Sequence, residues 1–579
     1  MKVLLLHPDE ALGEARAANH WDLVVDLGRA PIATYDRRSR QAGCPVVSIY
    51  DYAVEIDDLY RLRELLQIGT GLTVDSCGID WWDVLSLELV PQLQQLMLAC
   101  RLARELGASC ELYASRSHFL ATALQRLLGV RLKILENRVH AVTRQARHYR
   151  DAFALLDAPN LTQVFVDKFD SNHSIRRRFA RRRHTSGEPV VLLPSAYINV
   201  SRVVLLYSRL LPDHKFLLVW ARRNAKVPEL PDNVRTTPLT PYFVPNHERE
   251  TNYLLKSWSV LRKHLACNDE IFDLADAIGL LGEVPSLLRW GLSLRNAWSQ
   301  VFESENVTAC ISGDDSNPPS SIPLMMARKR GLPAIACHHG ALNSHMAIKS
   351  NHADVYLVKN EMERDYLRRV CKVPAHKTLI VARPTSKPLP AQRVTLPSAP
   401  WLVFFTEPYL SSGWRSDEVY RDLLPRLCAL AQACGLRLVF KLHPFDSIKG
   451  HRKMLRRFVP EYEYQIEVFA GPPADRLWIN TRLALTVQSS TALQCTTLGI
   501  PVFLCAWLRD PYSGYVQQYQ RFGVGHVLES PEQIADIPRL LEKQEATESG
   551  MDGASTKGGD AEKLARLFSP VHTLAAARG

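Results

Sequence analysis

Short apolar segments of strand length recur along the chain, and each is followed by a segment long enough for a helix. Before a proline-rich stretch they lie at residues 3–6, 23–25, 46–49, 190–193, 216–219, 309–312, 334–337 and 355–358. The pattern restarts afterwards at residues 401–405, 436–441, 483–487 and 502–505. Strands that alternate with helices favour parallel sheets, because each crossover helix returns the chain to the same edge. The sequence therefore predicts an α/β protein with doubly wound, Rossmann-type sheets.

Two breaks divide this pattern. Prolines concentrate between residues 383 and 400 and predict a hinge at 386–400, while an arginine cluster at residues 176–183 marks a weaker break. We expect Rossmann-like domains at residues 186–385 and 401–543, and a flexible Gly-, Ala- and Ser-rich tail at 544–579. Residues 1–185 form an N-terminal α/β region that is either an accessory domain or part of the first Rossmann domain.

Charge adds an expectation about partners. The chain has 579 residues, with 71 Lys and Arg against 60 Asp and Glu, which gives a net charge of +11. Such a balance attracts nucleic acid, an acidic membrane leaflet or phosphorylated small molecules. The arginine cluster lacks the interleaved aromatic residues of a single-strand nucleic-acid platform. We therefore expect no nucleic-acid partner.

Hydropathy and cysteine spacing bear on the compartment. No apolar run approaches the roughly 18 to 20 residues that cross a bilayer. The 12 cysteines include no C-x-x-C pair, which fits reduced thiols better than a disulfide framework or a zinc site. We expect a cytoplasmic protein without a signal peptide or membrane anchor.

The clearest candidate site follows the apolar segment at residues 483–487. Gln488 and Ser489 form a turn, Ser490 is in position to cap a helix, and Thr491 begins that helix. A helix start leaves backbone N–H groups unpaired, and the hydroxyls add donors, so this unit can hold a phosphate. The alternative is that Ser490 is only an N-cap.

A second candidate unit closes the segment at residues 436–441 with Lys441, His443 and Pro444. Both units lie at the carboxyl ends of strands in one predicted sheet, which is where open α/β sheets bind ligands. His443, cationic or hydrogen-bonding, can stabilise charge on a departing phosphate. Taken alone, a histidine at a strand end is more often a structural hydrogen-bonding group.

His443-Pro444, followed along the chain by Ser489-Ser490-Thr491, resembles the motifs of bacterial glycosyltransferases with the two-Rossmann GT-B architecture. More narrowly, the pattern is similar to capsule and lipopolysaccharide enzymes that use CMP-activated sialic acid or Kdo. It covers residues from about 188 to 540. The resemblance implies two Rossmann-type domains that face a central cleft. It further implies that CMP binds to the second domain through the two motifs and that the acceptor lies against the first.

The first domain carries candidate catalytic groups at its own strand ends. Asp314 and Asp315 follow the segment at residues 309–312, and His338 and His339 follow the next strand. Glycosyl transfer needs a base for the acceptor hydroxyl or a nucleophile for the sugar. The alternatives are loop capping for the aspartates and half-buried structural roles for the histidines. Because the acids are adjacent and not spaced D-x-D, we expect no required metal and no cofactor.

Two more loops complete the predicted rim. Ser195, Tyr197 and Asn199 are candidate hydrogen-bonding groups for a sugar, and Glu407 is a candidate for a ribose hydroxyl or for acid–base work. Each is also a residue type that caps loops.

The resemblance implies transfer of a Kdo-type ulosonic acid from CMP to a lipid-linked glycan, with retention, in capsule or lipopolysaccharide synthesis. The enzyme would be peripheral at the acidic inner face of the cytoplasmic membrane. Similar motifs occur in CDP-glycerol polyol-phosphate transferases, so that reaction is one alternative. The other is a basic membrane-surface scaffold without catalysis, which would bind no nucleotide.

Overall fold

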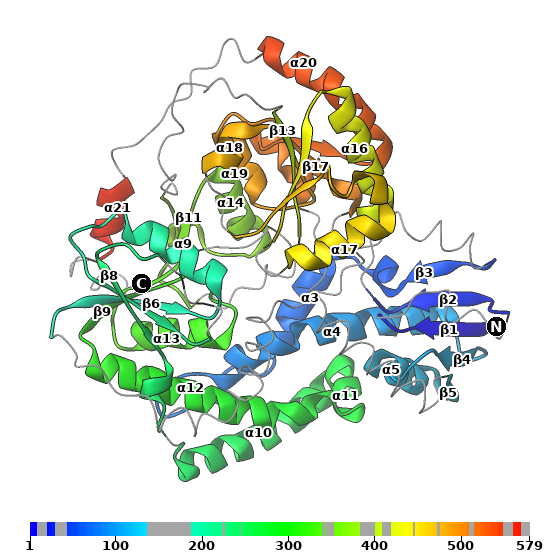
Figure 1. Ribbon diagram of the computed structural model, residues 1–579. Coiled ribbons are helices and arrows are strands. Elements are labelled where there is room, and N and C mark those ends of the chain that lie inside the picture. The colour runs from blue at the N-terminus through cyan, green and yellow to red at the C-terminus, as the bar shows by residue number, and fades with distance from the viewer. Residues whose placement is uncertain are drawn as a thin grey trace.

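A computed structural model describes most of the chain, and its strands form three separate parallel sheets (Figure 1). The described residues are 1–8, 20–28, 43–135, 187–222, 225, 227, 229–244, 246–337, 342, 352–381, 400–407, 419–443, 446–471, 475–508, 515–547 and 560–568.

The N-terminal sheet is built before residue 136 and has five strands in the order β3-β2-β1-β4-β5. These are β1 (Lys2–Leu6), β2 (Leu23–Asp26), β3 (Val46–Ser48), β4 (Glu111–Ala114) and β5 (Leu132–Ile134). The accompanying helices are α3 (Glu55–Gln67), α4 (Trp81–Leu106) and α5 (Phe119–Leu128). This region was predicted to be either an accessory domain or part of the first Rossmann domain. Its strands form a separate sheet and do not extend the middle sheet.

The middle sheet has seven strands in the order β12-β11-β10-β9-β6-β7-β8. They are β6 (Val190–Ser195), β7 (Phe216–Trp220), β8 (Val234–Pro238), β9 (Val307–Ser312), β10 (Ala334–Cys337), β11 (Val355–Val358) and β12 (Thr378–Ile380). Its helices are α9 (Ile198–Ser208), α10 (Glu248–Asn268), α11 (Glu270–Ala277), α12 (Val284–Ser304), α13 (Pro318–Lys329) and α14 (Glu361–Asp365). The chain winds outward from β6 in one direction and from β9 in the other, so the loops after these two neighbouring strands diverge.

The C-terminal sheet repeats this winding with six strands in the order β15-β14-β13-β16-β17-β18. They are β13 (Trp401–Phe405), β14 (Arg437–Lys441), β15 (Glu467–Phe469), β16 (Thr481–Thr486), β17 (Val502–Cys505) and β18 (His526–Leu528). Its helices are α16 (Leu424–Ala433), α17 (Ile448–Phe458), α18 (Asp475–Asn480), α19 (Thr491–Thr497) and α20 (Ile537–Thr547). Here the order reverses between β13 and β16.

The central strands of the two doubly wound sheets read as continuous apolar runs because helices cover both faces of these sheets. Every residue of β6 and of β13 is buried. Strands buried on both faces lose the alternation of polar and apolar positions that half-exposed strands show. The predicted α/β class with two doubly wound, Rossmann-type sheets is confirmed.

The N-terminal region packs tightly against the middle sheet through α4 and α12. Arg295 on α12 is 3% exposed and pairs with Asp75 at 2.9 Å and with Glu250 at 2.6 Å. Gly291 on the same helix lies against Trp81, where an added Cβ would clash with the ring. A buried charge network and a glycine contact together hold this region firmly in place.

The carboxyl-terminal edges of the middle and C-terminal sheets meet. The Tyr515 hydroxyl, beyond β17, donates to the carbonyl of Met362 at 2.8 Å and to Asp365 at 3.1 Å. Both acceptors belong to α14, the helix that follows β11. The two doubly wound sheets are therefore joined where their strands end.

Two helical segments lie within residues 544–579, where a flexible tail was predicted. Helix α20 runs to Thr547, and α21 (Asp560–Arg566) packs on the domain of the middle sheet. Leu564 is completely buried in that core, and the Phe568 ring lies 5.5 Å from His214. Its apolar face overrides the polar composition of the surrounding tail.

The predicted hinge at 386–400 lies outside the described residues except for its last residue, and the domain boundaries stay predictions. Within the described ranges, no helix is both long and apolar enough to cross a membrane.

Candidate functional site

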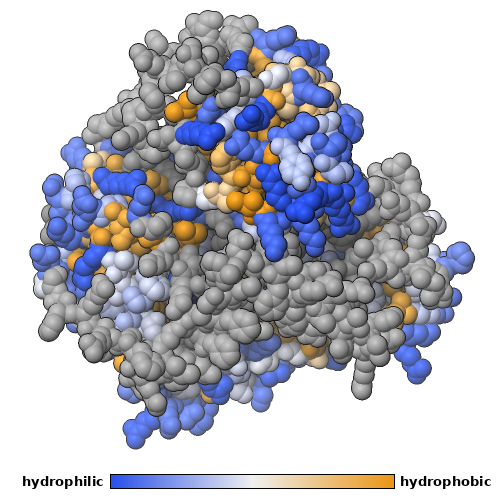
Figure 2. Space-filling view, in the orientation of Figure 1, coloured by the Kyte–Doolittle hydropathy of each residue, from blue (hydrophilic) through white to orange (hydrophobic). Residues whose placement is uncertain are grey.

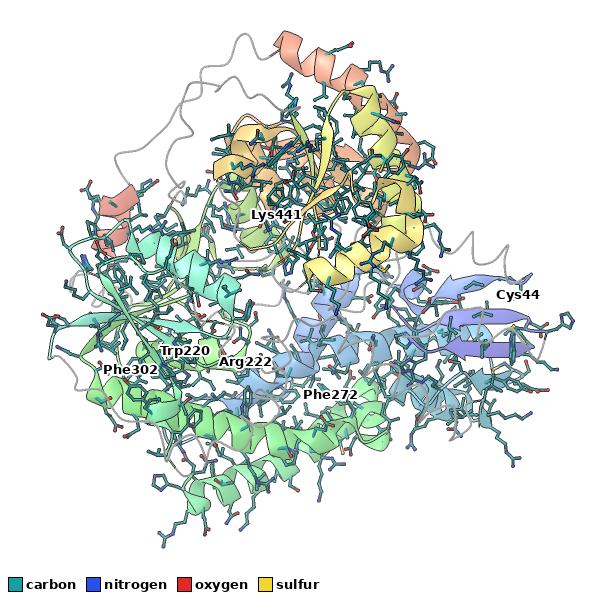
Figure 3. The ribbon with its side chains drawn as sticks, in the orientation of Figure 1. Cys44, Trp220, Arg222, Phe272, Phe302 and Lys441 are labelled. Carbon is teal, nitrogen blue, oxygen red and sulfur yellow. The ribbon has the colours of Figure 1, made fainter. Side chains whose placement is uncertain are left out.

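Two cations, one from the domain of each doubly wound sheet, lie close enough at the junction for their charges to repel. Lys441 ends β14, and burial, followed by the positive charge of Arg202 on α9, lowers its pKa to about 8. Burial also lowers the pKa of Arg202. The Lys441 Nζ donates to the carbonyl of Leu442 at 2.8 Å, and in the described part of the chain no carboxylate pairs with either cation. Figure 3 labels Lys441 in the C-terminal sheet. Two repelling cations without a counter-charge suit an anionic ligand.

His443 follows Lys441 and is held by its backbone. Its N–H donates to Thr406 Oγ1 at 2.9 Å. Burial, and then the charge of Lys441, lowers the pKa of His443 to about 4. At neutral pH His443 is therefore the neutral, hydrogen-bonding imidazole and not the cation, which was the other form that the sequence allowed. Pro444 lies outside the described residues.

A buried Tyr–His–Asp chain supports the His443 loop, and the sequence analysis missed it. The Asp446 N–H donates to the His443 carbonyl at 3.0 Å, and the His451 Nε2 lies 3.3 Å from Asp446 Oδ2. The Tyr420 hydroxyl contacts the other ring nitrogen, and burial lowers the pKa of His451 to about 3. The signal in the sequence was the pair of polar residues at Asp446 and His451, just beyond His443.

The start of α19 is capped differently from the prediction. Ser490 occupies the N-cap position, but its side chain makes no capping hydrogen bond. Ser489 Oγ instead accepts from the Thr491 N–H at 3.2 Å and lies 2.9 Å from the Thr491 hydroxyl. Ser490 has helical φ and ψ, which turns its hydroxyl away from that role. Among the described residues, the half-buried Ser490 hydroxyl therefore caps no backbone group.

Glu407 and Gln488 meet where the C-terminal sheet reverses its strand order. Burial raises the pKa of the Glu407 carboxyl to about 7, although a hydrogen bond from the Gln488 backbone opposes the shift. Gln488 is buried, and its carbonyl accepts from the Tyr519 hydroxyl at 3.3 Å. A carboxyl group that titrates near neutral pH is suited to proton transfer.

In the middle sheet, Asp314 sits in the corresponding place, where the loops after β6 and β9 diverge. It is 4% exposed and accepts from the Ser316 N–H at 2.8 Å and from the Ser316 hydroxyl. It also accepts from the Tyr197 hydroxyl at 3.0 Å and from the Asn317 amide. A carboxylate has about four lone-pair sites. These donors therefore occupy it, as the loop-capping alternative expected.

The other predicted groups of this sheet differ in access. Asp315 is 2% exposed and accepts from the Tyr356 hydroxyl at 2.7 Å. Ser195 is completely buried, with its hydroxyl 2.6 Å from that of Ser201, and its role as a sugar contact stays a prediction. Asn199 is half-buried in the first turn of α9. His338 and His339 lie outside the described residues.

Glu88 is a candidate that sequence reasoning missed. It lies on α4 of the N-terminal region and is exposed, yet it is close enough to the middle sheet to interact with Arg222 and Asp314. Desolvation of the Glu88 carboxyl is the main cause that raises its pKa. The negative charge of Asp314 adds to this shift, and the positive charge of Arg222 opposes it. Figure 3 labels Arg222 just beyond β7. No motif marks Glu88, because only folding brings α4 to this edge.

Within the described residues, no group of three or more His, Cys, Asp or Glu side chains is arranged to hold a metal ion.

No protein-family model matches the chain, and no curated protein sequence matches it. Among solved structures it is similar to the UDP-GlcNAc 2-epimerase of Methanocaldococcus jannaschii in complex with UDP-GlcNAc and UDP. That pair has 10% identity and a TM-score of 0.40, covering 66% of this chain and 98% of the other. The wall teichoic acid polymerase TagF with CDPG has 12% identity and a TM-score of 0.39, covering 77% and 100%. MnaA of S. aureus with UDP has 11% identity and a TM-score of 0.38, covering 67% and 96%. Values this low identify neither a family nor an activity, so the function is argued from the site itself.

Proposed function

We propose that this chain is a GT-B-type glycosyltransferase of bacterial surface-polysaccharide synthesis that takes a CMP-activated, Kdo-type ulosonic acid as donor. The observation that carries the proposal is the cation pair of Lys441 and Arg202, which has no carboxylate among the described residues. A nucleotide phosphate supplies the missing negative charge. The neutral His443 and the hydroxyl of Ser490, which caps no backbone group in the part of the chain that the structure describes, supply directional hydrogen bonds beside it.

In the reaction, the bond between the anomeric carbon and the phosphate oxygen breaks, and its electron pair leaves with CMP. Lys441 and Arg202 stabilise the charge that develops on that phosphate. Glu88, exposed and with a raised pKa, accepts the proton of the acceptor hydroxyl that attacks the anomeric carbon. Glu407 holds a ribose hydroxyl or exchanges a proton with the departing phosphate.

Retention through a double displacement needs a carboxylate nucleophile, which Asp314 or Asp315 would provide after one of its hydrogen bonds opens. Tyr197 and Asn199 remain the proposed sugar contacts, and we propose no required metal. The configuration of the product, read by NMR, decides between this route and direct displacement.

The acceptor is proposed to be a lipid-linked glycan at the acidic inner face of the cytoplasmic membrane. Helix α17 exposes Lys449, Lys453, Arg456 and Arg457, and Figure 2 shows hydrophilic residues gathered over this part of the molecule. Cationic side chains on one helix face attract anionic lipid. Binding to phosphatidylglycerol vesicles that is no stronger than binding to phosphatidylcholine vesicles would contradict this placement.

Calorimetric titration with CMP tests the nucleotide site. We expect saturable binding that Lys441→Met weakens by at least about tenfold, because an uncompensated charge is lost. Lys263→Met, which removes an exposed lysine on α10, is the matched control and should bind as the wild type does. Absence of CMP binding would favour a scaffold and reject the enzyme.

Product mass spectrometry then separates the two donors. Incubation with CMP-Kdo should add an ulosonic acid residue to the acceptor. A glycerol phosphate added from CDP-glycerol, with no product from CMP-Kdo, would instead identify the polyol-phosphate transferase.

A further inference from the structure

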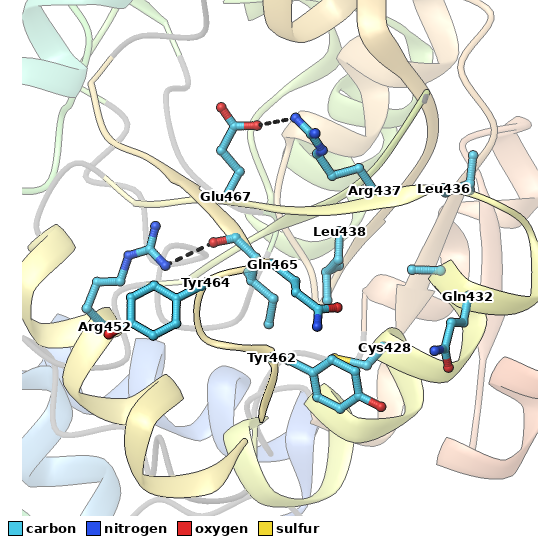
Figure 4. A pocket seen from close by; sticks show the side chains of 12 residues that line it. Cys428, Gln432, Leu436, Arg437, Leu438, Arg452, Tyr462, Tyr464, Gln465 and Glu467 are labelled. Carbon is cyan, nitrogen blue, oxygen red and sulfur yellow. Dashed lines mark hydrogen bonds and ion pairs between the residues drawn. The ribbon is translucent and has the colours of Figure 1, made fainter. Parts of the chain in front are cut away.

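A cavity of about 540 Å³ opens on the domain of the C-terminal sheet, away from the cation pair. It lies where β14 and β15 begin and where α16 ends, so it is at the opposite edge of the sheet from Lys441. Over the length of β14 the two edges are about 13 Å apart. Figure 4 shows the lining side chains. Those that carry the argument are Gln432, Arg437, Tyr462, Tyr464, Gln465 and Glu467.

An aromatic ring is presented to solvent at this cavity on a well-anchored turn. Tyr464 is 92% exposed. The turn that carries it is tied to α17, because Arg452 donates to the carbonyl of Ile466 at 3.0 Å and Arg456 pairs with Glu463 at 2.9 Å. An exposed aromatic face packs well against the apolar C–H face of a sugar ring, and a tyrosine side chain has only two χ angles to order on binding.

The polar groups of the cavity suit hydroxyls. In the described part of the chain, the Gln432 amide makes no side-chain hydrogen bond, and Gln465 Nε2 makes only a long one of 3.5 Å to the carbonyl of Glu461. An amide offers both a donor and an acceptor, as does a hydroxyl. Glu467 Oε2 is buried without a hydrogen bond, 3.6 Å from Arg437. This oxygen can accept a hydrogen bond from a ligand hydroxyl, while Arg437 balances the charge of the carboxylate, so the site needs no charged ligand.

We propose that this cavity is a glycan-binding subsite that holds one or two neutral sugar residues. If the proposed function is correct, those residues belong to the acceptor chain, at a point remote from the reacting end. The subsite then favours long acceptors over short ones. Loss of the subsite raises KM for long acceptors without changing kcat.

Saturation-transfer NMR on the full chain tests the subsite with maltotriose as a neutral probe and trigalacturonic acid as an acidic one. We expect signals from maltotriose and weaker signals from the acid. Tyr464→Ala should weaken maltotriose binding about tenfold, and Gln432→Ala should weaken it too. Both residues are exposed, so the variants should fold. Tyr253→Ala, at another exposed tyrosine on α10, is the matched control and should leave binding unchanged.

A wild-type chain that shows no maltotriose signal, or a Tyr464→Ala variant that keeps the full signal, would overturn the subsite. Equal or stronger binding of trigalacturonic acid would overturn the neutral ligand class. CMP titrated into the same samples reports on the donor site separately. If maltotriose binds and CMP does not, the subsite is supported and the proposed transferase function is rejected. If CMP binds and maltotriose does not, the transferase function is supported and the subsite is rejected.

Discussion

The hydroxyl of Tyr197 donates to Oδ2 of Asp314 across 3.0 Å and joins the loop after β6 to the loop after β9. These loops leave neighbouring strands in opposite winding directions, and the close packing of Gly313 on Val200 and Val203 also holds them together at this edge. The bond fixes the wall against which the acceptor is proposed to lie. It also holds the pKa of the Tyr197 phenol above its ordinary value, because burial and the neighbouring carboxylate disfavour the phenolate.

Tyr197→Phe should lower the free energy of unfolding by about 1–3 kcal/mol, since the variant removes a hydrogen bond to a buried carboxylate. Urea denaturation measures the difference. Tyr253→Phe removes an exposed hydroxyl on α10 and should change stability by no more than about 0.5 kcal/mol. Equal stability of the two variants would show that the Tyr197 bond contributes nothing.

Glu88→Gln should lower kcat by about 10²- to 10⁴-fold, the usual contribution of a general base, while CMP affinity stays unchanged. The reason is that Glu88 lies beside Arg222 and Asp314 at the acceptor wall. Steady-state assays with Glu64→Gln, an exposed change on α3, provide the comparison. If Glu88→Gln keeps full turnover and Asp314→Asn loses most of it, the general base is Asp314 and not Glu88.

Twelve strands were predictable because burial on both faces demands apolar runs that can be recognised in the sequence. The prediction missed β4 and the edge strands β5, β8, β12, β15 and β18, whose residues are partly exposed. The positions of Lys441 and His443 followed, since parallel strands end at one edge of their sheet. Neither Glu88 nor Arg202 carries such a signal. Their roles depend on how α4 and α9 pack against other elements. In the sequence, a charged residue on a helix that faces a functional site cannot be told from one that faces solvent.

Capping geometry was harder to predict than strand position. Ser489 and Ser490 are chemically equivalent neighbours, and only the backbone angles at the start of α19 decide which hydroxyl bonds to Thr491. The ordered helix α21 was missed for a related reason. Its apolar residues are few, and their partners near His214 lie far away in the sequence.

Glu407→Gln should stabilise the protein increasingly as pH rises from about 4.5 to 7. The folded pKa of Glu407 is about 7 against an ordinary 4.5, so between these values the folded chain keeps a proton that the unfolded chain has lost. Wild-type stability therefore falls with pH in this window, by up to about 3 kcal/mol, and the loss is complete above pH 7.

Urea denaturation of both proteins at pH 5, 6, 7 and 8 measures this difference. Glu461→Gln, at an exposed glutamate, should show no pH-dependent difference from the wild type. A constant difference between Glu407→Gln and the wild type at all four pH values would contradict the raised pKa of Glu407.

CMP affinity should fall as pH rises through about 8, because Lys441 is protonated below that value and neutral above it. The phosphate prefers the protonated lysine, so the dissociation constant should rise by up to tenfold per pH unit above about 8 and level off when the pKa of the bound form is passed. Calorimetric titrations at pH 7, 8, 9 and 9.5 follow the change. Lys441→Arg stays charged over this range and should bind with nearly constant affinity, since a guanidinium does not lose its proton there. If the wild type and Lys441→Arg show the same pH profile, the titrating group is not Lys441, and the phosphate must be held by other residues of the junction.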